Sequence, residues 1–183
     1  MLYRCKGRTR VNIELKYYGH DQRLEESVVE IVERAGMASD VVVMSLKQDG
    51  IRKIRELRPD WTIGLLLAKA AGDPTRVDAD FLAVHTGLVT RRFIRAAHRA
   101  GKQVFVWTVN DPINMSRMIG RGVDGVITDD PALLNQVMER RAALSSPERL
   151  LIETAFWLGM VPKDPRPEVD LASEAVEGIA PGT

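Results

Sequence analysis

The sequence predicts an α/β protein with a parallel sheet, because strand-like and helix-like patterns alternate six times along the chain. Strand starts recur about every 19 to 30 residues, enough for a strand, a helix and two turns. Parallel strands need such crossover connections, which are usually helical. The predicted strands cover residues 11–16, 41–46, 62–67, 81–85, 103–109 and 124–128.

The first predicted strand, residues 11–16, carries its polar side chains on one side. Side chains alternate across a strand, so Asn12, Glu14 and Lys16 share one face and three apolar residues take the other. The carboxyl end of a barrel strand is where chemistry usually lies. An edge strand with one solvated face explains the same pattern, and the pattern alone does not separate the two interpretations.

Helices are predicted between the strands. Apolar residues recur at helical spacing after the first strand, and Gly36 suits the position just beyond that helix. A shorter helix near residues 51–57 is stopped by Arg58-Pro59. Residues 68–80 are rich in Ala, Gly and Asp and predict a loop or a poor helix.

Capping residues predict the later helices. Thr90 suits an N-cap, and Asp111-Pro112 and Asp130-Pro131 each combine an N-cap with a proline in the first helical position. A further helix opens at Ser146-Pro147-Glu148 and ends near Gly159. From Pro162 onward the prolines, acids and lack of periodicity predict disorder.

Composition and charge exclude several classes of protein. The 183 residues suffice for one domain, and 26 basic against 25 acidic residues give a net charge of +1, so no global charge favours nucleic acid. A local basic run is better explained as a solvated helix face; it comprises Arg91, Arg92, Arg95 and Arg99. The single cysteine, Cys5, excludes an internal disulfide and a cysteine-based zinc site.

Hydropathy predicts a cytoplasmic protein for the chain as given. No run approaches the roughly 18 apolar residues of a membrane span. The basic N-terminus is not followed by the apolar stretch of a signal peptide. A longer parent protein would void this expectation and could place the chain at a membrane.

Six strands fit either an open doubly wound sheet or an incomplete barrel. A doubly wound fold that binds a dinucleotide should carry a glycine-rich turn after its first strand, and residues 17–20 offer one glycine. A complete (β/α)₈ barrel needs eight strands and about 250 residues.

Several segments together resemble the carboxyl-terminal part of the glycerophosphodiester phosphodiesterase family. The specific ones are V-W-T-V-N at residues 106–110 and G-V-I-T-D-x-P at residues 125–131. Residues 11–16, 41–46 and 96–102 match in order and separation. The resemblance implies the carboxyl-terminal portion of a TIM-type barrel of the phospholipase-C-like phosphodiesterase kind, with about six βα units. We expect a stub at 1–9, this partial domain at 10–137, a helical extension at 138–161 and a disordered tail at 162–183.

The resemblance also implies an activity and site residues. The family hydrolyses glycerophosphodiesters to glycerol 3-phosphate and an alcohol, in lipid metabolism, with a divalent cation, usually Ca²⁺ or Mg²⁺. By position, Glu14 is similar to a carboxylate metal ligand and Lys16 to the lysine that meets the phosphate. Trp107 is similar to the aromatic wall beside the glycerol. A hard cation prefers carboxylate oxygens, and developing phosphate charge favours a fixed ammonium.

The sequence departs from the family by lacking three of its segments: H-R-G, the E-x-D metal pair and H-D, which supply both acid-base histidines and two metal ligands. His20-Asp21 imitates the last one, but follows the Glu14 strand instead of preceding it. We therefore expect a loop histidine there. For His85 we favour a position at the strand end with its hydrogen-bonding groups satisfied over a position that faces the site. For His98 we expect a structural role.

Three interpretations follow. The first is a truncated family member that is inactive alone, binds no cation unaided and acts on glycerophosphodiesters only when completed. The second is a non-catalytic half barrel or one half of a split enzyme, which self-associates through its exposed surface. The third, an unrelated open sheet that binds a phosphorylated metabolite, is disfavoured by the missing glycine-rich loop.

Overall fold

The sheet has six parallel strands whose spatial order is their order in the chain. The computed structural model describes residues 2–18, 23–69 and 72–160. The strands are β1 Val11–Leu15, β2 Val41–Ser45, β3 Thr62–Leu67, β4 Phe81–His85, β5 Gln103–Trp107 and β6 Gly125–Val126. A doubly wound sheet reverses its strand order part-way, and this sheet does not. The incomplete barrel is therefore confirmed.

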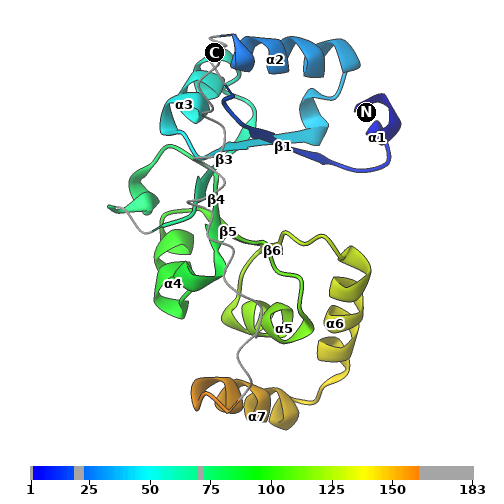
Figure 1. The fold of residues 1–183 in the computed structure, drawn as a ribbon, viewed down its shortest axis with the longest axis vertical. Helices are drawn as coiled ribbons and strands as arrows, with labels where there is room; N and C mark the ends of the chain where they lie inside the picture. Colours follow the sequence, from blue (N-terminus) through cyan, green and yellow to red (C-terminus); the bar gives the residue numbers. More distant parts are fainter. Residues whose placement is uncertain (1, 19–22, 70–71, 161–183) are drawn as a thin grey trace, which may run out of the picture.

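Helices follow most strands and lie around the curved sheet (Figure 1). They are α1 Leu2–Cys5, α2 Leu24–Ala35, α3 Gln48–Leu57, α4 Arg91–Arg99, α5 Pro112–Arg121, α6 Pro131–Ala143 and α7 Ser146–Trp157. Short 3₁₀ turns occur at η1 Ala38–Asp40, η2 Pro74–Arg76 and η3 Thr86–Leu88. The connection between β3 and β4 contains η2 alone among its described residues, which agrees with the loop predicted over 68–80.

The predicted helix boundaries are set by side-chain caps. Asp111 accepts a hydrogen bond from the Asn114 N–H at 2.7 Å, and Asp130 accepts one from Leu133 at 2.9 Å. Thr90 accepts from Phe93 in the same way. Gly36 ends α2 with a φ of +63°, where a side chain would be strained.

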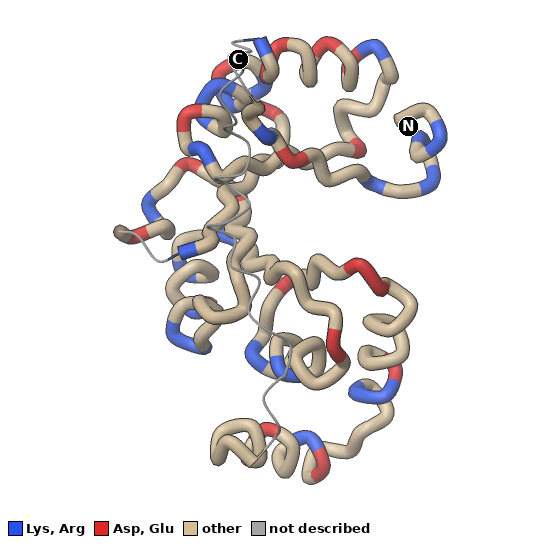
Figure 2. The backbone as a smooth tube through the Cα atoms, in the orientation of Figure 1, with Lys and Arg blue, Asp and Glu red and all other residues tan. Residues whose placement is uncertain are grey.

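Side chains of the strands form two layers. The larger core, between sheet and helices, includes Val43, Leu65, Val84 and Val106. Burying such a side chain contributes about 1.5–3 kcal/mol. A second cluster covers the opposite, concave face of the sheet and contains Met44, Leu66, Phe81 and Ala83, with Val42, Phe105, Trp107 and Ile127 packed against them. Charged residues are concentrated on helices and loops, and the middle strands carry almost none (Figure 2).

Two glycines make room for the aromatic rings of the concave layer. Phe81 and Phe105 stack with centroids 4.9 Å apart. A Cβ added at Gly64 would lie 2.1 Å from the Phe81 ring, and one at Gly125 would lie 2.9 Å from the Phe105 ring. The rings can therefore lie flat across neighbouring strands only because those strands carry no side chain there.

The structure differs from the sequence expectations at the end of β5. The strand was predicted to run through residue 109, but β5 ends at Trp107, and Val109 packs into the helix-side core. α1 lies within the expected stub at 1–9, and the division expected at residue 137 falls inside α6 and remains a prediction. The tail from Pro162 lies outside the described residues. None of the described helices is both long and apolar enough to cross a membrane.

Candidate active site

The carboxyl end of β1 places a carboxylate and an ammonium group side by side on the concave face. Asn12 donates from Nδ2 to the Met44 sulfur at 3.4 Å, which fixes this face of β1 on the concave side. Glu14 shares that face by alternation. Lys16 is the first residue after β1, and its Nζ lies 3.9 Å from Glu14 Oε1. The side chains of Lys16 and Glu14 are 55% and 29% exposed, respectively. A pair this long and exposed contributes little stability, so both charges stay available to a ligand.

The residue after Lys16 anchors this end of the strand. Tyr17 donates its hydroxyl proton to Glu25 Oε1 at 2.5 Å, and the buried Glu25 also pairs with Lys53 at 3.2 Å. Lys47 lies over the Tyr17 ring, 4.4 Å from its centroid. Burial and the adjacent Glu25 carboxylate raise the pKa of Tyr17 far above its usual value, so the phenol stays protonated and keeps donating.

Trp107 and His85 lie at the carboxyl ends of β5 and β4, also on the concave side. They are register partners, and their rings meet edge to face with centroids 5.9 Å apart. The indole N–H donates to the Ala83 carbonyl at 2.9 Å, which fixes the ring orientation. His85 Nδ1 accepts from the Gly87 N–H at 3.3 Å and begins η3. The expected strand-end role of His85 is confirmed. Its ring also lies at the carboxyl ends of the strands on the concave side, the region that we call the barrel mouth.

His98 does not join this group. His98 lies in the last turn of α4 and bonds through Nε2 to Asp124 Oδ2 at 2.7 Å. This contact supports the structural role expected for it. The dipeptide His20-Asp21 lies outside the described residues.

A polar network next to the mouth was not expected from the sequence. Asn110 donates from Nδ2 to Asp129 at 2.6 Å and accepts from the Thr128 hydroxyl at 3.0 Å. Asp130 caps α6 as predicted, whereas Asp129, the residue before it, bonds to Asn110. The network ties the end of β5 to the end of β6. This network could have been predicted from the V-W-T-V-N and T-D segments, because their polar residues follow two neighbouring strands.

The described residues do not form a complete metal site. No group of three or more histidine, cysteine, aspartate or glutamate side chains is arranged among them to hold an ion. Ca²⁺ takes about six to eight oxygen ligands, and Mg²⁺ is bound through one or two carboxylates plus water or phosphate oxygens. Glu14 offers one carboxylate and lies in no such group, so the described residues do not by themselves complete an oxygen cage, and the family's further carboxylates would have to come from elsewhere.

Comparison with known proteins decides the family. The model of the Glycerophosphoryl diester phosphodiesterase family matches residues 3–133. The chain belongs to this family. Its match includes all six strands and the residues Glu14, Lys16 and Trp107.

Individual relatives agree with that assignment. A glycerophosphodiester phosphodiesterase of Caldanaerobacter subterraneus subsp. tengcongensis is 29% identical over 139 residues, covering 71% of this chain and 56% of the relative. A crystal structure of a glycerophosphodiester phosphodiesterase from Parabacteroides distasonis aligns with a TM-score of 0.66 and 25% identity, over 73% of this chain and 58% of that one.

A phosphodiesterase of Oleispira antarctica, solved with the product sn-glycerol-3-phosphate, has the same fold, with a TM-score of 0.65 and 19% identity. It aligns over 71% of this chain and 55% of its own. The chain thus spans about half the length of the relatives it matches.

Proposed function

We propose that this chain supplies the carboxyl-terminal six βα units of a barrel that hydrolyses glycerophosphodiesters to glycerol 3-phosphate and an alcohol. In this reaction the oxygen of a water molecule bonds to phosphorus, the bond from phosphorus to the alcohol oxygen breaks, and the alcohol leaves with a proton. The observation that carries the proposal is the Glu14–Lys16 pair at the carboxyl end of β1, on the same face of the sheet as Trp107.

Each of these residues has a role that its surroundings support. Lys16 would bind the phosphate and stabilise the charge that develops on it, because its ammonium is exposed and only weakly paired. The indole of Trp107 is held by the Ala83 carbonyl and would form a wall beside the glycerol. Glu14 would be one oxygen ligand of the family's Ca²⁺ or Mg²⁺, in a site that needs further carboxylates.

The chain by itself should have negligible phosphodiesterase activity. General acid-base groups each contribute about 10² to 10⁴ in rate. The H-R-G and H-D segments that supply them in the family do not precede the Glu14 strand here, and His20-Asp21 follows that strand. The family's pair of metal-binding carboxylates, E-x-D, is absent from the expected place as well.

The test is a complementation assay with glycerophosphocholine as substrate. The purified chain is assayed alone, and then with a co-expressed polypeptide that carries the family's first strands with H-R-G, E-x-D and H-D. We expect turnover only in the mixture, and expect a chelator to abolish it. Chelator-sensitive turnover by the chain alone would contradict the proposal and would make His85 or His20 the candidate acid-base group.

The alternative is a half barrel that binds a partner without catalysis. It is favoured by one observation: β1 and β6 are the two edges of the sheet, and among the described residues each has a neighbouring strand on one side alone. Gel filtration with light scattering separates the two. A stable dimer that stays inactive in the mixture favours the alternative, whereas a chain that assembles with the added segment and gains turnover favours the enzyme.

A further inference from the structure

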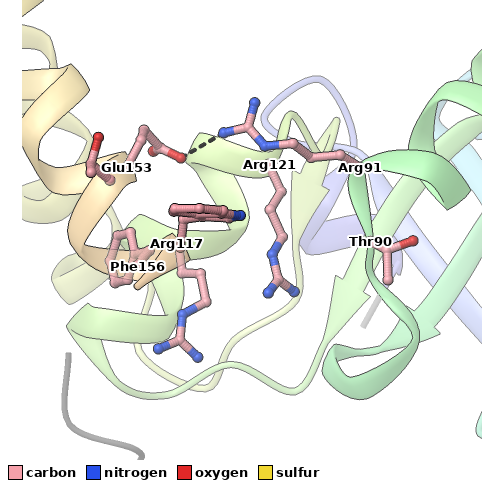
Figure 3. Close-up of a pocket in the computed structure, with 8 residues that line it drawn as sticks. Thr90, Arg91, Arg117, Arg121, Glu153 and Phe156 are labelled. Carbon is pink, nitrogen blue, oxygen red and sulfur yellow. Dashed lines mark hydrogen bonds and ion pairs between the residues drawn. The ribbon is translucent and has the colours of Figure 1, made fainter. Parts of the chain in front are cut away.

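A cavity in the outer helix layer lies apart from the barrel mouth. It has a volume of about 440 Å³ and lies between the start of α4, the face of α5 and the end of α7 (Figure 3). Three arginines, Arg91, Arg117 and Arg121, line it together with Glu153 and Phe156. None of the residues proposed for the active site takes part in its lining.

The charge of the cavity is positive. Three arginines and one glutamate line it, so the lining carries a net charge of +2. Glu153 is already shared between two guanidinium groups: Oε2 accepts from Arg91 at 2.7 Å, and Oε1 accepts from Arg141, outside the lining, at 3.2 Å. Its negative charge is therefore used within the protein.

Arg117 and Arg121 contact neutral groups. Arg117 donates to Asn114 Oδ1 at 3.2 Å and lies 5.1 Å from the centroid of the Phe156 ring. Arg121 donates to the Val89 carbonyl. Among the residues that the structure describes, neither guanidinium forms an ion pair with a carboxylate. Burial, and then the neighbouring Arg117 and Arg91, lower the pKa of Arg121.

We propose that this cavity binds a phosphate group, carried either by a free organic phosphate or by a phospholipid headgroup. Guanidinium groups present forked N–H donors that match phosphate oxygens, and partly desolvated pairs of this kind are strong. Phe156 and Trp157 border the same space, and Trp157 is 84% exposed. They offer an aromatic surface to the apolar part of the ligand. The site is independent of the phosphodiester chemistry at the mouth.

Calorimetry of the full chain with inorganic phosphate tests the proposal. Arg117→Gln and Arg121→Gln should each weaken phosphate binding at least about tenfold, since hydrogen bonds to charged groups contribute about 1.5–3 kcal/mol. Raising the salt concentration should weaken binding in the unmodified chain. Arg52→Gln is the matched control, because Arg52 is 71% exposed and pairs with Asp49 on α3, far from the lining residues in the sequence.

A second comparison separates this cavity from the proposed active site. The phosphate site that is lost in Arg117→Gln and Arg121→Gln should be retained in Lys16→Met, since Lys16 does not line the cavity and its loss removes only phosphate bound at the proposed active site. Binding that is lost in Lys16→Met and kept in both arginine variants would overturn the proposal, as would no phosphate binding at tens of millimolar. If Arg121→Gln melts at a much lower temperature, Arg117→Gln and the charge-preserving Arg121→Lys decide, because the contacts of Arg117 with Asn114 and Phe156, both neutral, lie within α5 and against α7.

Vesicle sedimentation identifies the source of the phosphate. The chain is mixed with vesicles of phosphatidylcholine alone and with vesicles that also contain phosphatidic acid. Binding to the acidic vesicles that is lost in Arg117→Gln and Arg121→Gln supports a lipid headgroup. Binding of inorganic phosphate with no vesicle binding supports a free organic phosphate.

Discussion

Charged side chains at the two ends of the parallel sheet differ in how closely they are paired. At the amino end, Asp80 accepts from the Ile63 N–H at 2.8 Å and from Arg55 at 2.9 Å. Asp124 accepts from the Val104 N–H at 2.7 Å and meets His98 at the same distance. At the carboxyl end, Glu14 and Lys16 meet only at 3.9 Å.

This difference separates stability from function. A carboxylate that bonds a strand N–H and a side chain of a neighbouring helix or loop joins elements that are distant in the sequence. Glu14 and Lys16 have no comparably close partner in the part of the chain described, so a ligand that binds them need not displace a strong contact. The division matches the general rule that barrels bind at the carboxyl end of their strands and are stabilised at the other. Substitutions at the two ends should therefore have separable effects.

The largest effect is expected for Glu14→Gln in the complemented enzyme. The change keeps the shape of the side chain and removes the charge that a hard cation needs, so turnover of glycerophosphocholine should fall below detection. Glu30→Gln, on the exposed side of α2, is the matched control and should keep full turnover. Full cation-dependent turnover by Glu14→Gln would show that the assignment of this residue is wrong.

Lys16→Met should lower kcat by about 10² or more, since an ammonium aimed at developing charge acts in the transition state. Lys16→Arg should recover part of the loss because it restores the charge. Steady-state kinetics of the complemented enzyme measure both. The urea midpoint of the chain should stay unchanged in Lys16→Met, because the lysine is exposed and weakly paired. A marked shift in that midpoint would contradict the proposed separation.

The opposite result is expected at the amino end. Asp124→Ala removes the acceptor for the buried Val104 N–H, and leaving such a donor unsatisfied costs about 1–3 kcal/mol. Urea unfolding should show this loss with an unchanged slope. The activity of the complemented enzyme under conditions where the variant is folded should be close to normal. Loss of turnover in a fully folded Asp124→Ala chain would contradict the proposed separation between a stabilising amino end and a functional carboxyl end.

Much of the fold follows from local patterns. The six strands and the caps Thr90, Asp111 and Asp130 are encoded within a few residues each, so alternation and capping rules were sufficient for them. The order of the strands was left open by these rules, and the barrel was indicated by the family resemblance. Val109 was included in the fifth predicted strand, but the chain leaves the sheet after Trp107. Strand ends depend on pairing with neighbours, which a single segment does not reveal.

The site was predicted in part, because its roles came from resemblance and its contacts from tertiary packing. Glu14 and Lys16 were placed correctly on one face by alternation. The Tyr17–Glu25–Lys53 anchor was not predicted, since Lys53 lies 28 positions from its partner. The arginine cavity was missed for the same reason: Arg91 and Glu153 are 62 positions apart. Taken alone, the arginines of α4 predicted only a solvated face.

Trp107→Ala should raise the KM for glycerophosphocholine about tenfold with a small change in kcat, because an aromatic wall binds ground and transition states about equally. Trp107→Phe should lie between, since it keeps an apolar ring and loses the hydrogen bond to Ala83. Equal falls in kcat and kcat/KM would place Trp107 in transition-state stabilisation instead.

The smallest effect is expected from an exposed pair at the amino end. The Arg58 guanidinium, 2.7 Å from Asp60, holds the pKa of that carboxyl below its ordinary 3.8. Since the folded pKa is the lower one, the pair stabilises the fold above the unfolded pKa and loses this contribution as pH falls through the folded value. Asp60→Asn should therefore lower the melting temperature slightly at pH 7, and the difference should shrink as the pH falls below 3.8 and vanish once the folded carboxyl is protonated. Asp78→Asn, at a carboxylate 80% exposed and 3.6 Å from Arg55, is the control and should show a smaller change. A deficit in Asp60→Asn that persists unchanged at low pH would mean that its carboxylate charge is not the cause.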